Sequence, residues 1–102
     1  MGAVDFLVFK KAETAREAYR IARDEAVRFA GENSYNGTIS TTDFRGVAGR
    51  VAEEWGPEVE ESARRAVRDD FGYGEKWECL ALDCGRDADG RTVWALFGQA
   101  AC

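Results

Sequence analysis

The chain of 102 residues contains no histidine, one proline and three cysteines. Without histidine, neither a Ser-His-Asp or Cys-His catalytic site nor a His-ligated metal site can form. The cysteines, Cys79, Cys84 and Cys102, lack paired spacing, which indicates reduced thiols in a cytoplasmic protein. No apolar run approaches the length of a membrane span, and we expect no signal peptide at the N-terminus. These absences predict a cytoplasmic protein that is not an enzyme and uses no cofactor or metal.

Length and composition indicate a single domain over residues 1–102. A hydrophobic share of 45% with 12% aromatic residues is typical of a globular chain that buries a core without disulfides or a metal. We therefore expect one α+β domain without linkers or repeats.

The net charge of -5 is concentrated in one segment. Residues 53–75 hold eight acidic and three basic groups, which accounts for the whole excess. Such a surface repels nucleic acid and favours a basic protein partner. The alternative is a solvated helix face, on which early glutamates offset the helix dipole. The residues predicted to bind a partner are Glu53, Glu54, Trp55, Glu58, Glu60, Glu61, Asp69 and Asp70.

The first part of the chain predicts a strand followed by a helix. Residues 3–9 are rich in Val and Phe, as a buried strand requires. Thr14 and Glu17 form a capping box for a helix that runs to about residue 30 and ends at Gly31. The inner stripe predicted for this helix is Ala18, Ala22, Ala26 and Phe29.

Two more helices are expected in the middle of the chain. After Thr42 or Asp43, apolar residues recur at helical spacing up to Trp55, which predicts a second helix. Gly56-Pro57 then breaks the chain, and Pro57 is suited to the first turn of a third helix. The apolar residues used for the second helix are Phe44, Val47, Ala48, Val51, Ala52 and Trp55.

The last quarter predicts a β-hairpin. Residues 76–84 and 92–98 are strand-like runs, joined by the turn residues 85–90. The expected fold is therefore three helices packed on a three-stranded antiparallel sheet, in the order β-α-α-α-β-β. Because neither face of the hairpin is clearly polar, an apolar sheet face could also be buried in a homodimer.

A polar loop between the first helix and the rest of the chain is a second candidate site. Its hydroxyls and backbone amides could hold a phosphate or a nucleotide, although no base lies nearby to support catalysis. Alternatively Thr38 bonds nearby backbone and Tyr35 packs its ring on the core. The residues of this alternative ligand loop are Tyr35, Asn36, Thr38, Ser40, Thr41 and Thr42.

Short motifs give the chain a family resemblance. It combines an alanine-rich capped helix, a Tyr-x-Gly-Thr-Ile motif and a terminal hairpin, and so resembles small uncharacterised proteins of bacteriophages and prophages. The matching residues are Tyr35, Gly37, Thr38, Ile39, Lys76, Trp77, Phe97, Gly98 and Ala100. The resemblance implies a viral or mobile-element origin and action in the cytoplasm of a host cell. It favours an anti-CRISPR-like inhibitor that occupies a basic surface of a host defence or nucleic-acid-binding machine, without touching nucleic acid itself.

Overall fold

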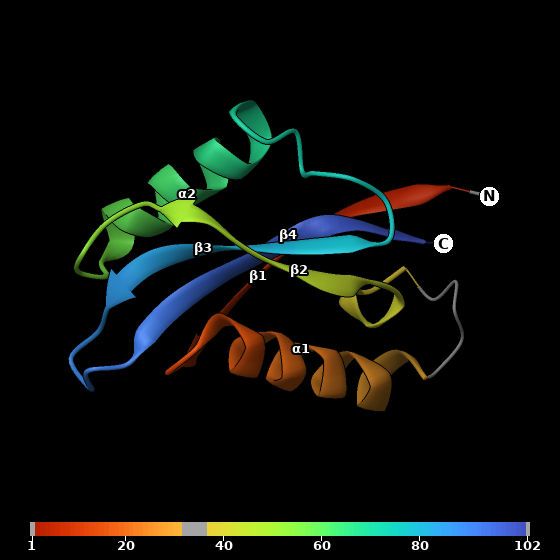
Figure 1. The fold of residues 1–102 in the computed structure, drawn as a ribbon, viewed down its shortest axis with the longest axis horizontal. Helices are drawn as coiled ribbons and strands as arrows, with labels where there is room; N and C mark the ends of the chain where they lie inside the picture. Colours follow the sequence, from red (N-terminus) through yellow and green to blue (C-terminus); the bar gives the residue numbers. More distant parts are fainter. Residues whose placement is uncertain (1, 32–36, 102) are drawn as a thin grey trace.

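The structure is a computed structural model that describes residues 2–31 and 37–101. Its four strands form one sheet in the order β1-β4-β3-β2 (Figure 1). β4 runs antiparallel to both β1 and β3, whereas β2 runs parallel to β3. The elements are β1 (Ala3–Ala12), α1 (Ala15–Ala30), the short 3-10 helix η1 (Ile39–Thr41), β2 (Asp43–Arg50), α2 (Pro57–Asp69), β3 (Glu78–Arg86) and β4 (Thr92–Ala101).

A helix covers each face of the sheet. In Figure 1, α2 lies above the strands and α1 lies below them. Trp94 and Leu96 of β4 belong to the core under α1, and the alternating Ala95 and Phe97 belong to the core under α2. The central strands are therefore apolar on both faces. The homodimer expected through an apolar sheet face stays a prediction.

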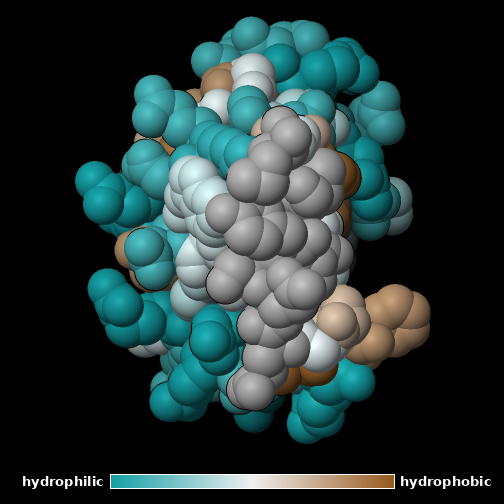
Figure 2. Space-filling view, turned by 90° about the vertical axis from the view of Figure 1, so that its right-hand side faces the viewer, coloured by the Kyte–Doolittle hydropathy of each residue, from teal (hydrophilic) through white to brown (hydrophobic). Residues whose placement is uncertain are grey.

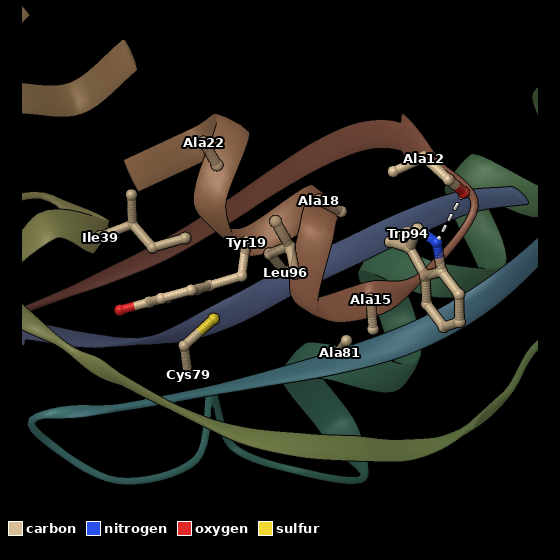
Figure 3. Close-up of a cluster of buried hydrophobic side chains, with 10 residues drawn as sticks. All are labelled: Ala12, Ala15, Ala18, Tyr19, Ala22, Ile39, Cys79, Ala81, Trp94 and Leu96. Carbon is tan, nitrogen blue, oxygen red and sulfur yellow. Dashed lines mark hydrogen bonds between the residues drawn. The ribbon is translucent and has the colours of Figure 1, made fainter. Parts of the chain in front are cut away.

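Small side chains bring α1 close to the sheet. Ala18 and Ala22 are buried against strand residues such as Leu96, and the Trp94 indole N–H donates to the Ala12 carbonyl at 3.1 Å (Figure 3). Tyr19 fills the far end of this cluster, where its hydroxyl donates to the Thr42 carbonyl. The alanines thus set the distance between α1 and the strands.

The predicted limits of α1 are confirmed. The Thr14 hydroxyl accepts a hydrogen bond from the Glu17 amide at 3.1 Å, and Gly31 ends the helix at φ 85°. The expectation for Phe29 is wrong, since its side chain is 93% exposed. Its spacing places it on the inner side of α1, but no described element covers this last turn of the helix.

The second predicted helix is wrong, because residues 43–50 form strand β2. Two β-bulges shift the register, so that Phe44 pairs with Cys79 while Val47 pairs with Ala81. Three residues of β2 thus match two of β3, which places the apolar residues Phe44 and Val47 three positions apart. That distance resembles the spacing of a helix. Gly46 supports one bulge with φ 130°.

The expected three helices on a three-stranded antiparallel sheet are therefore corrected to two helices and a four-stranded mixed sheet. The α+β class and the terminal hairpin stand. Pro57 begins α2, as predicted, and this helix carries the chain between the parallel strands β2 and β3. No helix in the described part of the chain is both long and apolar enough to cross a membrane.

The crowding at Gly98 gives a test of this topology. Gly98 lies between Phe6 of β1 and Cys79 of β3, and a Cβ atom there would lie 2.0 Å from the Glu78 carbonyl oxygen. We expect Gly98→Ala to lower the free energy of unfolding by about 3 kcal/mol, measured by urea denaturation. Gly49→Ala is the control, because a Cβ atom at position 49 would lie an ordinary 3.7 Å from the nearest atom, Cδ2 of Leu82. Equal losses in the two variants would contradict the strand order.

Candidate protein-interaction site

The predicted partner residues follow β2 and continue along α2. Glu53 and Glu54 lie in the connection before the helix, and Glu58 lies in its first turn. Asp69 and Asp70 lie at the far end of the helix. The structure thus spreads these residues along the length of α2 and does not bring them all together.

The backbone of the connection is bonded to the end of β3. The Trp55 amide donates to the Arg86 carbonyl at 2.9 Å, and the Arg86 amide donates to the Glu53 carbonyl at 3.0 Å. Gly85 makes room for this approach, since a Cβ atom there would lie 2.6 Å from the backbone of Glu54. The carboxylates of Glu53 and Glu54 therefore project from a segment whose backbone is held by two hydrogen bonds to Arg86.

Most acidic groups on α2 are offset by arginines. Arg64 pairs with Glu60 at 3.3 Å and Arg65 pairs with Glu61 at 3.7 Å, both at i, i+4 spacing. At the end of the helix, Arg68 donates a hydrogen bond to Asp69 at 2.8 Å, and this bond lowers the pKa of the Asp69 carboxyl. These pairs contribute little net charge to the surface.

Four of the acidic residues predicted to bind a partner make no ion pair with another described residue: Glu53, Glu54, Glu58 and Asp70. The first three lie within six positions of the chain, just before α2 and in its first turn, and we call them the acidic patch. The Glu58 carboxylate lies beside Gly56, the N-cap residue, which offers no side chain to the free amides of the first turn. Its charge is stabilised there by the helix dipole.

Trp55 is half-buried beside the acidic patch. Its ring packs on Phe9 of β1 at 5.5 Å between centroids, and the Arg64 guanidinium lies 5.2 Å above the Phe9 ring. The rest of the indole borders a shallow hollow shared with Arg86 and Asp87. Trp55 thus anchors the connection to the core and presents only part of its surface to a partner.

The hairpin turn next to the patch satisfies its own charges. Lys11 binds Asp87 at 2.8 Å and Asp89 at 3.1 Å, which lowers the pKa of Asp87 and raises the pKa of Lys11. Across the sheet end, Arg50 pairs with Asp83 at 3.4 Å. None of these described pairs includes a residue of the acidic patch, and Arg86 lines the same hollow as Glu53 and Glu54.

The described hydroxyls of the polar loop bond to the chain itself. Thr38 caps η1 by accepting from the Ser40 amide at 3.3 Å, and Thr42 donates to the Ile39 carbonyl at 2.7 Å. Thr41 accepts from the Ala101 amide at 3.0 Å, which ties the loop to the end of β4. Tyr35 and Asn36 lie outside the described residues. A structural role thus accounts for the hydroxyls seen here, and ligand binding by this loop stays a prediction.

Sequence reasoning found the acidic segment but missed Gly85, which holds it. The sequence assigns Gly85 only to the hairpin turn, because its contact with Glu53 and Glu54, more than 30 positions earlier in the chain, leaves no local pattern. Among the described residues, no three His, Cys, Asp or Glu side chains are grouped to bind a metal ion. Comparison with protein-family models, with curated proteins and with solved structures found no match to the chain.

The two buried thiols, Cys79 and Cys84, predict a loss of stability at high pH. Burial raises the pKa of each thiol from 9.0 to about 12, because the apolar core disfavours the thiolate. The folded state therefore keeps these protons longer than the unfolded chain does. The resulting stability is fully present below pH 9.0 and is lost as the pH rises through about 12.

We expect urea denaturation to show a falling free energy of unfolding across this range. Burial also raises the pKa of Tyr19, which acts in the same direction. The control is Cys79→Ala with Cys84→Ala, which is less stable at neutral pH but has a flatter dependence on pH. The two thiols are not buried in solution if wild type and the double variant lose stability equally.

Proposed function

We propose that this protein is an interaction module whose acidic patch binds a basic surface of a partner protein. The observation that carries the proposal is the unpaired charge of Glu53, Glu54 and Glu58 at the start of α2, beside helix charges that are already offset. Such a concentration of one sign steers a basic partner toward this end of the molecule.

The backbone contacts at Gly85 favour binding further. Because two hydrogen bonds to Arg86 hold the backbone of the connection, the backbone that carries these carboxylates needs little ordering when a partner binds. Less conformational entropy is then lost on association. Trp55 supplies a partly exposed aromatic surface next to the charges, and aromatic residues of this kind are frequent at interface hot spots.

The resemblance to phage proteins supports a finer proposal for the partner. A host defence or nucleic-acid-binding machine has a basic groove that recognises phosphates. Carboxylates that occupy this groove compete with the nucleic acid. On this proposal the protein acts in the host cytoplasm as an inhibitor and makes no contact with nucleic acid itself.

The test compares two variants with the same change of net charge. One replaces the acidic patch, by Glu53→Gln, Glu54→Gln and Glu58→Gln. The matched control replaces three paired acids of α2, by Glu60→Gln, Glu61→Gln and Asp69→Asn. Each is used with wild type to capture proteins from a bacterial lysate at low salt, and the captured proteins are identified by mass spectrometry.

We expect wild type and the control to enrich a basic nucleic-acid-binding protein that the patch variant captures poorly. With that protein purified, the patch variant should associate about tenfold more slowly at low salt. The difference should disappear near 1 M salt, where the Debye length is about 3 Å. Competing DNA or RNA should release the partner from wild type.

Folding of the patch variant should change little. Loss of the Glu58 charge at the helix start should lower the free energy of unfolding by about 0.3–1 kcal/mol. The proposal is wrong if the patch variant captures the same proteins as wild type at the same rate, or if the control variant loses them equally.

A further inference from the structure

A group of arginines lies beside α1, away from the acidic patch. On the face of the molecule shown in Figure 2, hydrophilic side chains predominate around the grey residues, and apolar colour gathers at the lower right. Three arginines of the first half of α1 border a hollow of about 470 Å³, which we call the arginine hollow. Its lining consists of Thr14, Arg16, Glu17, Tyr19, Arg20 and Arg23.

The guanidinium groups of the arginine hollow are not neutralised by carboxylates. Arg16 and Arg20 form no ion pair with any described residue, and Arg23 only approaches Asp24 at 3.9 Å. Glu17 is the single acidic side chain in the lining, and it forms no ion pair within the described chain either. The arginines of α2, by contrast, are paired with acidic residues. The arginine hollow therefore carries a net positive charge on a protein whose total charge is -5.

The spacing of these arginines is unfavourable for the helix itself. Arg16 and Arg20 are four positions apart, and Arg20 and Arg23 are three apart, so like charges are neighbours along one side of α1. Arg16 also lies in the first turn of the helix, where the dipole favours acidic groups. Charges that conflict with their own helix are typical of a functional site, because a bound ligand can supply the opposite charge.

One of the guanidiniums is held in place by an aromatic stack. Arg16 lies 5.3 Å from the centre of the Phe44 ring, and the Tyr19 ring stacks on Phe44 at 5.3 Å between centroids. The Tyr19 hydroxyl in turn donates to the Thr42 carbonyl, which fixes the stack to the backbone. Arg16 therefore loses little conformational entropy when a ligand binds.

We propose that the arginine hollow binds a short chain of phosphate groups, carried by a nucleotide or present as free polyphosphate. A guanidinium is planar and offers its N–H donors in a fixed fork, which matches the oxygens of a phosphate group. Three guanidiniums at neighbouring helix positions can contact successive phosphates of one ligand. A long nucleic acid fits less well, because it would run from the hollow across a surface with an overall charge of -5.

Isothermal titration calorimetry of the full chain with inorganic tripolyphosphate at low salt tests the site. We expect wild type to bind one tripolyphosphate per chain. In Arg20→Gln with Arg23→Gln the Kd should rise about tenfold or more, because two charge-assisted contacts are lost. The matched control is Arg64→Gln with Arg65→Gln, which has the same net charge but removes arginines that are already paired with glutamates. The control should bind like wild type.

Arg16→Gln is an independent variant, because it removes the guanidinium held over Phe44, and it should also weaken binding. The midpoint of urea denaturation of Arg20→Gln with Arg23→Gln should match that of wild type, since both side chains are exposed. A nucleoside triphosphate used in place of tripolyphosphate distinguishes the two sources of the ligand. Tighter binding of the nucleotide assigns the hollow to nucleotides, and equal binding assigns recognition to the phosphates alone.

Four results would overturn the proposal. These are no binding of tripolyphosphate, equal binding by wild type and Arg20→Gln with Arg23→Gln, an equal loss of binding in the control, and tighter binding of single-stranded DNA than of tripolyphosphate. The outcome is separate from partner capture, because the acidic-patch variant keeps all three arginines and should still bind tripolyphosphate.

Discussion

The contact between Gly85 and the backbone of Glu53 and Glu54 is the constraint on which the proposed site depends. A side chain at position 85 would occupy the space of that backbone, with a Cβ atom only 2.6 Å from it. Glycine also adopts the φ of 93° at this position without strain. The segment from Glu53 to Trp55 can therefore cross the end of β3 and form two backbone hydrogen bonds with Arg86. The position of Glu53 and Glu54 in the acidic patch follows from this crossing, because their carboxylates project from a fixed backbone.

The layered arrangement decides where the molecule can meet others. α1 and α2 cover the two faces of the sheet, so the sheet itself is open only at its ends and edges. The acidic patch lies at one end, at the start of α2. The regular edge of β1 lies on the side of the sheet opposite to β2.

Local signals in the sequence predicted local structure well. The capping box of Thr14 and Glu17 and the position of Pro57 each marked a helix start, because a cap depends on a few adjacent residues. β2 was missed because its bulges replace the two-residue repeat of a strand with steps of three. Those bulges are defined by pairing with β3, which is distant in sequence.

The candidate site was likewise predictable only where it depends on residues that are close together in the sequence. The acidic residues and the i, i+4 pairing of Glu60 with Arg64 follow from composition and spacing. Which acids stay unpaired, and that Trp55 packs on Phe9, depends on contacts between distant elements. The role of Gly85 also depends on a contact with residues distant in sequence. Sequence reasoning located the acidic segment, and the fold determined which of its side chains stay unpaired.

Amide hydrogen exchange at Trp55 and Arg86 tests the central claim, that backbone contacts over Gly85 hold Glu53 and Glu54 of the acidic patch. Both amides donate in these contacts. We expect them to be protected in wild type and to exchange much faster in Gly85→Ala, while the amide of Leu96 in the centre of the sheet stays protected. Unprotected Trp55 and Arg86 amides in wild type, or unchanged protection in Gly85→Ala, would contradict the account.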